Sequence, residues 1–89
     1  MKHACLAVTY RKGRLIAAYY SLPRRNGDHS VRTERQESGL IVDYAEDGRP
    51  IGIEITSPST TEPSQLRQLL ARLGFETVDE REFAPLATA

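Results

Sequence analysis

Two acidic residues, Asp43 and Glu54, are the strongest candidates for chemistry in this sequence. They fall on the same face of a predicted hairpin, near Gly52, whose missing side chain leaves room for another group to approach. Paired carboxylates can bind a metal ion or act as general acid and base. The pattern places no third ligand and no nucleophile beside them. We therefore keep a ligand-binding or hydrolytic site here as a weak alternative, and expect both acids to be solvated or to pair with Arg32 or Arg35.

Other motifs that would carry chemistry are sparse. His3 and Cys5 share a strand face and could supply two zinc ligands, but a closed structural site needs four, commonly with Cys-x-x-Cys spacing. The sequence contains no glycine-rich phosphate loop and no Gly-x-Ser-x-Gly nucleophile motif. We therefore predict no metal site, no cofactor and no catalytic residue.

A group of arginines is the candidate for nucleic-acid binding. Basic residues interleaved with aromatic ones, here Tyr19 and Tyr20, are how several RNA-binding sheets work. The formal net charge of the chain is zero, which is unusual for such domains, so this interpretation is the runner-up. The group comprises Arg24, Arg25, Arg32 and Arg35.

Length and composition predict a single small domain. The chain has 89 residues, and its one cysteine excludes an internal disulfide and fits a reducing compartment. The apolar run near the N-terminus is too short for a signal peptide or a membrane span, so we expect a soluble cytoplasmic protein without membrane contact. Residues 1–35 hold eight basic and two acidic residues, whereas residues 36–89 hold four basic and ten acidic. This asymmetry could form a basic surface for an acidic partner, but we favour packing of the two halves together or head-to-tail pairing in an oligomer.

Residues 38–56 carry the clearest folding signal, which is that of a β-hairpin. If Asp47 and Gly48 form a two-residue primed turn, Tyr44 pairs with Ile51, and the pairing continues away from the turn along both strands. This register gathers the large apolar residues on one face, and a shift by one residue would move one strand's apolar set to the other face. The remaining predicted pairs are Val42 with Ile53 and Leu40 with Ile55.

An earlier hairpin is predicted around Lys12 and Gly13, with Tyr10 opposite Leu15, Val8 opposite Ala17 and Leu6 opposite Tyr19. Both of its faces are largely apolar, whereas a sheet with one solvated side alternates apolar and polar residues. We therefore expect a second copy or another partner to cover one face, which would otherwise expose a continuous apolar patch. The predicted interface residues are Cys5, Ala7, Ile16, Ala18 and Tyr20.

The remaining elements complete an α+β fold. Residues 30–37 suit a charged edge strand. Residues 65–73 have leucines at helical spacing (Leu66, Leu69, Leu70 and Leu73), a cap at Thr61 or Ser64, and Gly74 as terminator. Residues 77–80 could add a strand. The predicted architecture is a small antiparallel sheet of two hairpins plus an edge strand, with one amphipathic C-terminal helix, in a single domain of residues 1–83 with a frayed tail at 84–89.

The central hairpin resembles the small bacterial proteins grouped as domain of unknown function 2283. Their core has an extended V-D-Y-D-x-D-G-x-x-V-G-I-E-I-L pattern, preceded by a tyrosine-bearing hairpin, and the resemblance covers roughly residues 6–59. Their first turn is usually acidic, whereas this chain has basic residues at 11–14. The resemblance implies a small β-rich fold with no established activity, and some members look like antitoxins. The matching residues are Val42, Asp43, Tyr44, Asp47, Gly48, Gly52, Ile53, Glu54 and Ile55.

Taken together, these patterns favour a non-enzymatic protein–protein interaction module. We expect it to act as a homodimer or as the antitoxin-like partner of a toxin-like protein. Nucleic-acid binding through residues 24–35 is the alternative, and a ligand site at Asp43 and Glu54 is the weaker one.

Overall fold

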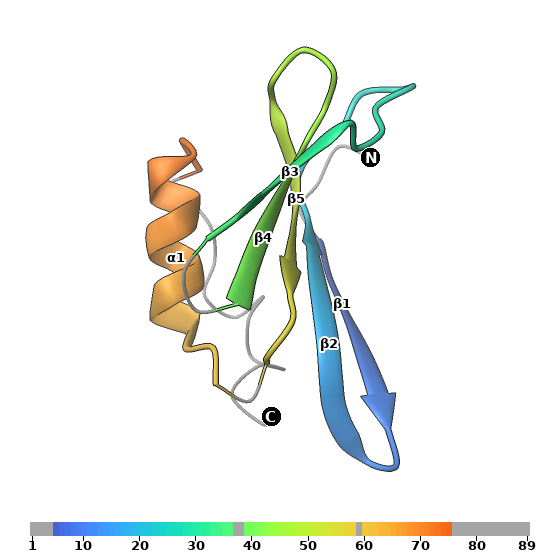
Figure 1. The fold of residues 1–89 in the computed structure, drawn as a ribbon, viewed down its shortest axis with the longest axis vertical. Helices are drawn as coiled ribbons and strands as arrows, with labels where there is room; N and C mark the ends of the chain where they lie inside the picture. The colour runs from blue at the N-terminus through green and yellow to red at the C-terminus, as the bar shows by residue number, and fades with distance from the viewer. Residues whose placement is uncertain (1–4, 37–38, 59, 76–89) are drawn as a thin grey trace.

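A five-stranded antiparallel sheet with one helix on one of its faces makes up the described part of the chain (Figure 1). The computed structural model describes residues 5–36, 39–58 and 60–75. The strand order is β1-β2-β5-β4-β3, so β1 and β3 are the edges. This arrangement confirms the predicted α+β class with two hairpins and an edge strand. The elements are β1 (Cys5–Arg11), β2 (Arg14–Ser21), β3 (Arg32–Arg35), β4 (Leu40–Tyr44), β5 (Pro50–Ile55) and α1 (Pro63–Arg72).

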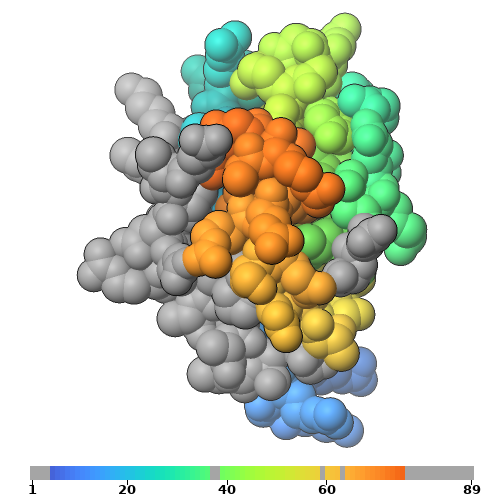
Figure 2. All heavy atoms as spheres, turned by 90° about the vertical axis from the view of Figure 1, so that its left-hand side faces the viewer, coloured from blue at the N-terminus to red at the C-terminus, as the bar shows by residue number. Residues whose placement is uncertain are grey.

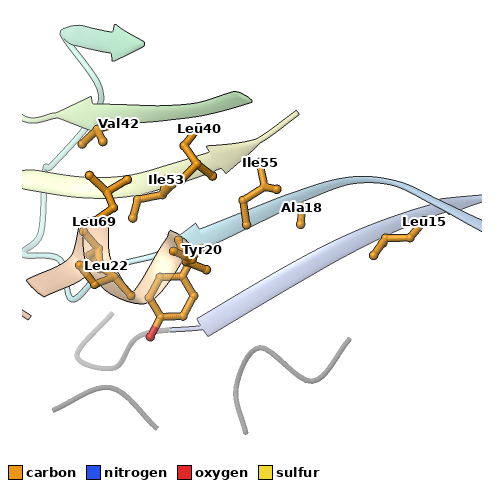
Figure 3. Packing of buried hydrophobic residues seen from close by; sticks show 11 residues of the cluster. Leu15, Ala18, Tyr20, Leu22, Leu40, Val42, Ile53, Ile55 and Leu69 are labelled. Atoms are coloured by element: carbon orange, nitrogen blue, oxygen red, sulfur yellow. The ribbon is translucent and has the colours of Figure 1, made fainter. Parts of the chain in front are cut away.

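The hydrophobic core lies between the sheet and α1. Residues paired across β2, β5 and β4 alternate between the two faces, and every second one points toward the helix (Figure 3). In the view onto α1, the helix lies over the middle of this face and the β1–β2 turn emerges at its lower end (Figure 2). The buried cluster comprises Leu15, Ala18, Tyr20, Leu22, Leu40, Val42, Ile53, Ile55, Leu66, Leu69 and Leu70.

The helix begins earlier than predicted, and with a different cap. Glu62 is the N-cap residue, and its backbone N–H donates to Oε1 of Gln65 at 2.9 Å. The predicted cap at Thr61 or Ser64 is therefore wrong, and the buried Thr61 hydroxyl instead donates to the Ser57 carbonyl at 2.9 Å. The predicted end is correct: Gly74 has a φ of 94°, and the residue after it donates its N–H to the carbonyl of Leu70 at 2.8 Å.

The central hairpin has the predicted pairing but not the predicted turn. Leu40 pairs with Ile55 and Val42 with Ile53, as expected. The loop has three residues, because the Ala45 N–H donates to the Arg49 carbonyl and the Gly48 N–H to the Ala45 carbonyl, each at 2.9 Å. Within the loop only Gly48 has positive φ, at 89°, which matches a type I turn followed by a glycine bulge.

The extra loop residue of that hairpin shifts the pairing next to it. Tyr44 faces Pro50 rather than Ile51, so the predicted pair between Tyr44 and Ile51 is wrong. The three-residue loop needs left-handed geometry at the glycine alone, whereas a two-residue turn would also have forced Asp47 into positive φ.

The first hairpin contains a bulge that the prediction lacked. Lys12 and Gly13 form the two-residue turn with φ of 53° and 77°, and Tyr10 pairs with Leu15 as predicted. The register then shifts, so that Val8 faces Ala18 and Leu6 faces Tyr20. The predicted pairs of Val8 with Ala17 and Leu6 with Tyr19 are therefore wrong. The bulge inserts Ile16 as an extra residue and exchanges the two faces of the strand beyond it.

Some predictions fall on residues outside the described ranges. These are the ligand role of His3, the strand at residues 77–80, the domain boundary at residue 83 and the tail at residues 84–89.

Candidate functional site

The sheet face opposite α1 carries a polar cluster centred on Tyr19, Asp43 and Arg24. Strand pairing puts Gly52 between Ser21 of β2 and Asp43 of β4. Tyr19 lies two residues along β2 from Ser21, on the same face, so its ring can reach across the glycine. The hydroxyl of Tyr19 donates to Oδ2 of Asp43 at 2.7 Å.

Arg24 holds the tyrosine from the other side. Its Nη2 donates to the Tyr19 hydroxyl at 3.0 Å, and its Nε donates to the Ile51 carbonyl at 3.3 Å. The guanidinium carbon lies 6.0 Å from the centre of the Tyr19 ring. The β2–β3 loop is thereby fixed against the face opposite α1, through a tyrosine that accepts from a cation and donates to an anion.

Gly52 is required for this arrangement. A Cβ built at position 52 would lie 1.9 Å from the Tyr19 hydroxyl and 2.3 Å from the ring carbon that bears it. The missing side chain noted in the sequence is therefore space for the tyrosine.

The surroundings raise the pKa of Tyr19 from 10.0 to about 12. Burial of the phenol is the largest cause, followed by its hydrogen bond to Asp43 and the negative charge of that residue, whereas Arg24 acts in the opposite direction. The phenol therefore stays protonated across the physiological range, and it serves as a hydrogen-bond donor to the carboxylate.

Asp43 and Glu54 lie on the same face, as the sequence predicts, but they do not form an isolated pair. Asp43 lies opposite Gly52, and Glu54 lies diagonally from it, opposite Ile41. Asp43 binds the Tyr19 hydroxyl, while Glu54 is exposed. Among the described residues, no three His, Cys, Asp or Glu side chains lie close enough together to hold a metal ion.

The roles of Tyr19 and Arg24 were missed by the sequence reasoning. Finding them requires the pairing between β2 and β5, which joins residues more than thirty positions apart. The available signal was Gly52 opposite an acidic residue in a strand, which indicates that another side chain crosses that point.

The four predicted basic residues do not form one patch. Arg32 and Arg35 are three residues apart on β3, so their side chains project from opposite faces. Arg32 forms an ion pair with Glu34, and its guanidinium carbon lies 4.3 Å from the centre of the Tyr44 ring.

Arg24 and Arg25, in contrast, line one hollow of about 550 Å³. Arg49 also lines it, and the apolar part of its wall comes from the residues that follow α1 and from two prolines. The lining residues are Pro23, Arg24, Arg25, Arg49, Pro50, Leu73 and Phe75.

Arg49 joins the β2–β3 loop to the β4–β5 turn. Its Nη2 donates to Asp28 at 2.7 Å and its Nε donates to Asp47 at 2.6 Å. These hydrogen bonds lower the pKa of Asp28 and of Asp47 and raise the pKa of Arg49. The Arg49 charge is thus matched by two carboxylates, whereas Arg24 donates to a phenol hydroxyl and to a backbone carbonyl, which are both uncharged.

The predicted interface residues do not share one face, because the bulge at Ile16 separates them. Ala18 and Tyr20 are buried in the core, with 3% and 0% of their surface exposed. Cys5 and Ala7 are exposed on the face opposite α1, and Ile16 is 46% exposed. Only these last three residues are available to a partner in this fold.

The two edges of the sheet differ in character. β1 has seven residues, and its first six, Cys5 to Tyr10, contain no charge and no proline. Within the described residues, β1 pairs with β2 alone. β3 has only four residues, of which Arg32, Glu34 and Arg35 are charged. Short, charged edges resist strand pairing, whereas long uncharged ones invite it.

In the part of the chain that the structure describes, no helix has the length and apolar character needed to cross a membrane.

Comparison with curated proteins and with solved structures gives no significant match. A family model described as "Protein of unknown function (DUF2283)" matches residues 18–59, from the middle of β2 to beyond the end of β5. β1 and α1 lie outside the matched segment. Residues 18–59 match this family, which confirms the resemblance predicted from the central hairpin.

Proposed function

We propose that this protein is a non-enzymatic protein–protein interaction module that forms a homodimer through the β1–β2 hairpin. The observation that carries the proposal is the edge of β1, which is uncharged from Cys5 to Tyr10 and whose outer backbone groups have no partner among the described residues. In this role, the amphipathic helix predicted from the sequence covers one face of the sheet and leaves the edge for association. An antitoxin-like role, in which a toxin-like protein binds this edge, rests on the family resemblance alone.

The exposed side chains near the edge support association at the same place. Tyr10 and Ile16 are 52% and 46% exposed, and both lie near the β1–β2 turn, which projects past the helix (Figure 1). Large apolar and aromatic side chains contribute most to interface stability when they become buried. The hairpin therefore offers backbone hydrogen-bonding groups and apolar surface together.

The chemistry of the polar cluster also favours a structural role over a catalytic one. A phenol with a pKa of about 12 is a poor general base near neutral pH. Tyr19, Asp43 and Arg24 satisfy one another by hydrogen bonds. They fix the loop and the strands that support the hairpin.

Light scattering across a dilution series tests the proposal. The unmodified chain should change from dimer to monomer on dilution, because a strand edge alone buries less than the roughly 1,000 Å² typical of stable complexes. Ala7→Lys and Ile16→Asp should give folded monomers at concentrations where the unmodified chain is dimeric. Thr33→Lys, an exposed change on the opposite edge β3, should leave the dimer intact. A monomer at every concentration would contradict the proposal.

A specific observation favours nucleic-acid binding as the second candidate function. Arg24 donates to the Tyr19 hydroxyl and to a backbone carbonyl, both uncharged, and it lines a hollow with Arg25 and Arg49. A guanidinium held this way can still bind a phosphate group. Titration with single- and double-stranded nucleic acid at low salt tests this candidate.

A further inference from the structure

The direction of the backbone groups on β1 determines how a second copy can bind. Arg11 and Arg14 flank a two-residue turn, so their backbone groups bond to each other across the hairpin. Backbone direction alternates along a regular strand, and the bulge residue lies on β2, not on β1. Consequently the N–H and C=O groups of Thr9, Ala7 and Cys5 point toward β2, and those of Tyr10, Val8 and Leu6 point away from it.

We propose that two copies pair antiparallel along β1, with Val8 on the two-fold axis. This inference rests on the proposed homodimer and adds its register. In an antiparallel ladder, hydrogen-bonded pairs form only between residues whose backbone groups both point across the seam. Val8 then faces Val8 of the second copy, and Leu6 faces Tyr10 of the second copy in both directions. The three pairs form two hydrogen bonds each.

This register is favoured over its neighbours by overlap and by charge. It pairs all seven residues of β1, whereas a seam centred on Ala7 or on Thr9 leaves strand residues unmatched. Arg11 lies opposite Cys5 of the second copy, so no like charges face each other across the seam. A two-fold pairing is also the commonest way for identical chains to associate.

The geometry of the combined sheet is self-consistent. Leu6 and Val8 pack on the core face. Side chains of residues that face each other across the seam project from the same face of the combined sheet. The helices of both copies therefore lie on the same side of that sheet. The described strands of the two copies then form one continuous ten-stranded sheet. Its two charged β3 strands lie at the outer edges, where they discourage further growth.

Cysteine cross-linking tests the register directly, because the seam places residue 7 opposite residue 9 of the second copy. Ala7 and Thr9 are exposed and form a non-hydrogen-bonded pair, whose Cα atoms lie close enough for a disulfide. Two variants are made in a Cys5→Ser background, one with Ala7→Cys and the other with Thr9→Cys. Each is incubated in a glutathione redox buffer, alone and mixed, and circular dichroism confirms that each folds.

The mixture should form disulfide-linked dimers several-fold more abundantly than either variant alone. Cross-linking of the Ala7→Cys variant alone would indicate a seam centred on residue 7, and that of the Thr9→Cys variant alone a seam centred on residue 9. Either result overturns the register. The unmodified chain is a further control, because the proposed seam separates its two Cys5 residues by about 20 Å.

The same samples separate the two possible failures. A dimer in light scattering without the cross-link between residues 7 and 9 refutes the seam and leaves the proposed homodimer standing. A monomer in light scattering, with no cross-link in any sample, refutes both. If deleting residues 76–89 is needed before dimers appear, the chain's own C-terminal segment occupies the edge, and the seam is not the native state.

Discussion

The hydroxyl of Tyr19 lies 2.7 Å from Oδ2 of Asp43, directly over the backbone of Gly52. This contact connects β2 to β4 across the intervening strand β5. It explains why a glycine occupies the middle of a central strand, where a side chain would ordinarily add stability. The contact between Tyr19 and Asp43 therefore depends on the strand order, in which β5 lies between β2 and β4.

Gly52→Ala should destabilise the fold by about 1–3 kcal/mol, because the new Cβ would force the Tyr19 ring out of place. In a Tyr19→Ala background the same change should cost much less, since the conflicting ring is gone. Chemical denaturation of the four proteins of this double-mutant cycle measures the coupling. Equal costs in both backgrounds would show that the ring does not occupy the space over Gly52.

The raised pKa of Tyr19 predicts an alkaline loss of stability. The folded chain holds this proton more tightly than the unfolded chain, so the contribution of Tyr19 is complete below pH 10 and is lost as the pH rises toward about 12. The stability difference between the unmodified chain and Tyr19→Phe should therefore shrink across this interval. Denaturation at a series of pH values checks the effect. A constant difference would contradict it.

Asp43→Asn should lower the pKa of Tyr19, because the variant removes the negative charge that opposes ionisation. Ultraviolet titration of the phenolate, with Tyr19→Phe to identify the step that belongs to this residue, measures the change. An unchanged titration step would show that Asp43 does not interact with the phenol.

Leu69→Ala should cost about 2–5 kcal/mol, because Leu69 has only 3% of its surface exposed and packs between α1 and the sheet. Its neighbour Gln68 is exposed, so Gln68→Ala should change the free energy of unfolding by no more than about 0.5 kcal/mol. Thermal or chemical denaturation compares the two variants. Similar small losses in both would show that the helix does not pack on the sheet in solution.

If the hollow at Arg24 and Arg25 binds nucleic acid, affinity should fall steeply with salt as counterions are released. Replacing both arginines with alanine should reduce the slope of log affinity against log salt by about 2. Arg14→Ala, at the distant β1–β2 turn, is the matched control. Absence of binding by the unmodified chain at low salt would eliminate this candidate.

Much of the fold could be predicted because it follows from local patterns of apolar and polar residues. The alternation of Leu40 and Val42 against Ile53 and Ile55 leaves one register that buries all four. The turn next to them was mispredicted because Asp-Gly suits both a two-residue and a three-residue loop, and the choice depends on backbone geometry that the pattern does not encode.

The first hairpin shows a second limit. Ala17, Ala18, Tyr19 and Tyr20 are apolar in succession, so no alternation reveals where a bulge exchanges the faces. Ala18 and Tyr20 were consequently expected at an interface but lie in the core. The polar cluster required the pairing of β2 with β5, which is a long-range contact that sequence periodicity cannot supply.

Amide hydrogen exchange of β1 at two protein concentrations tests whether two copies associate through this edge. The Val8 amide should exchange rapidly in dilute samples, where its N–H points to solvent, and should become protected in concentrated samples, where it bonds to the second copy. The Thr9 amide, which points toward β2, should be protected in both. A Val8 amide whose exchange rate is the same at both concentrations, while light scattering records dimers in the concentrated sample, would contradict association through the edge of β1.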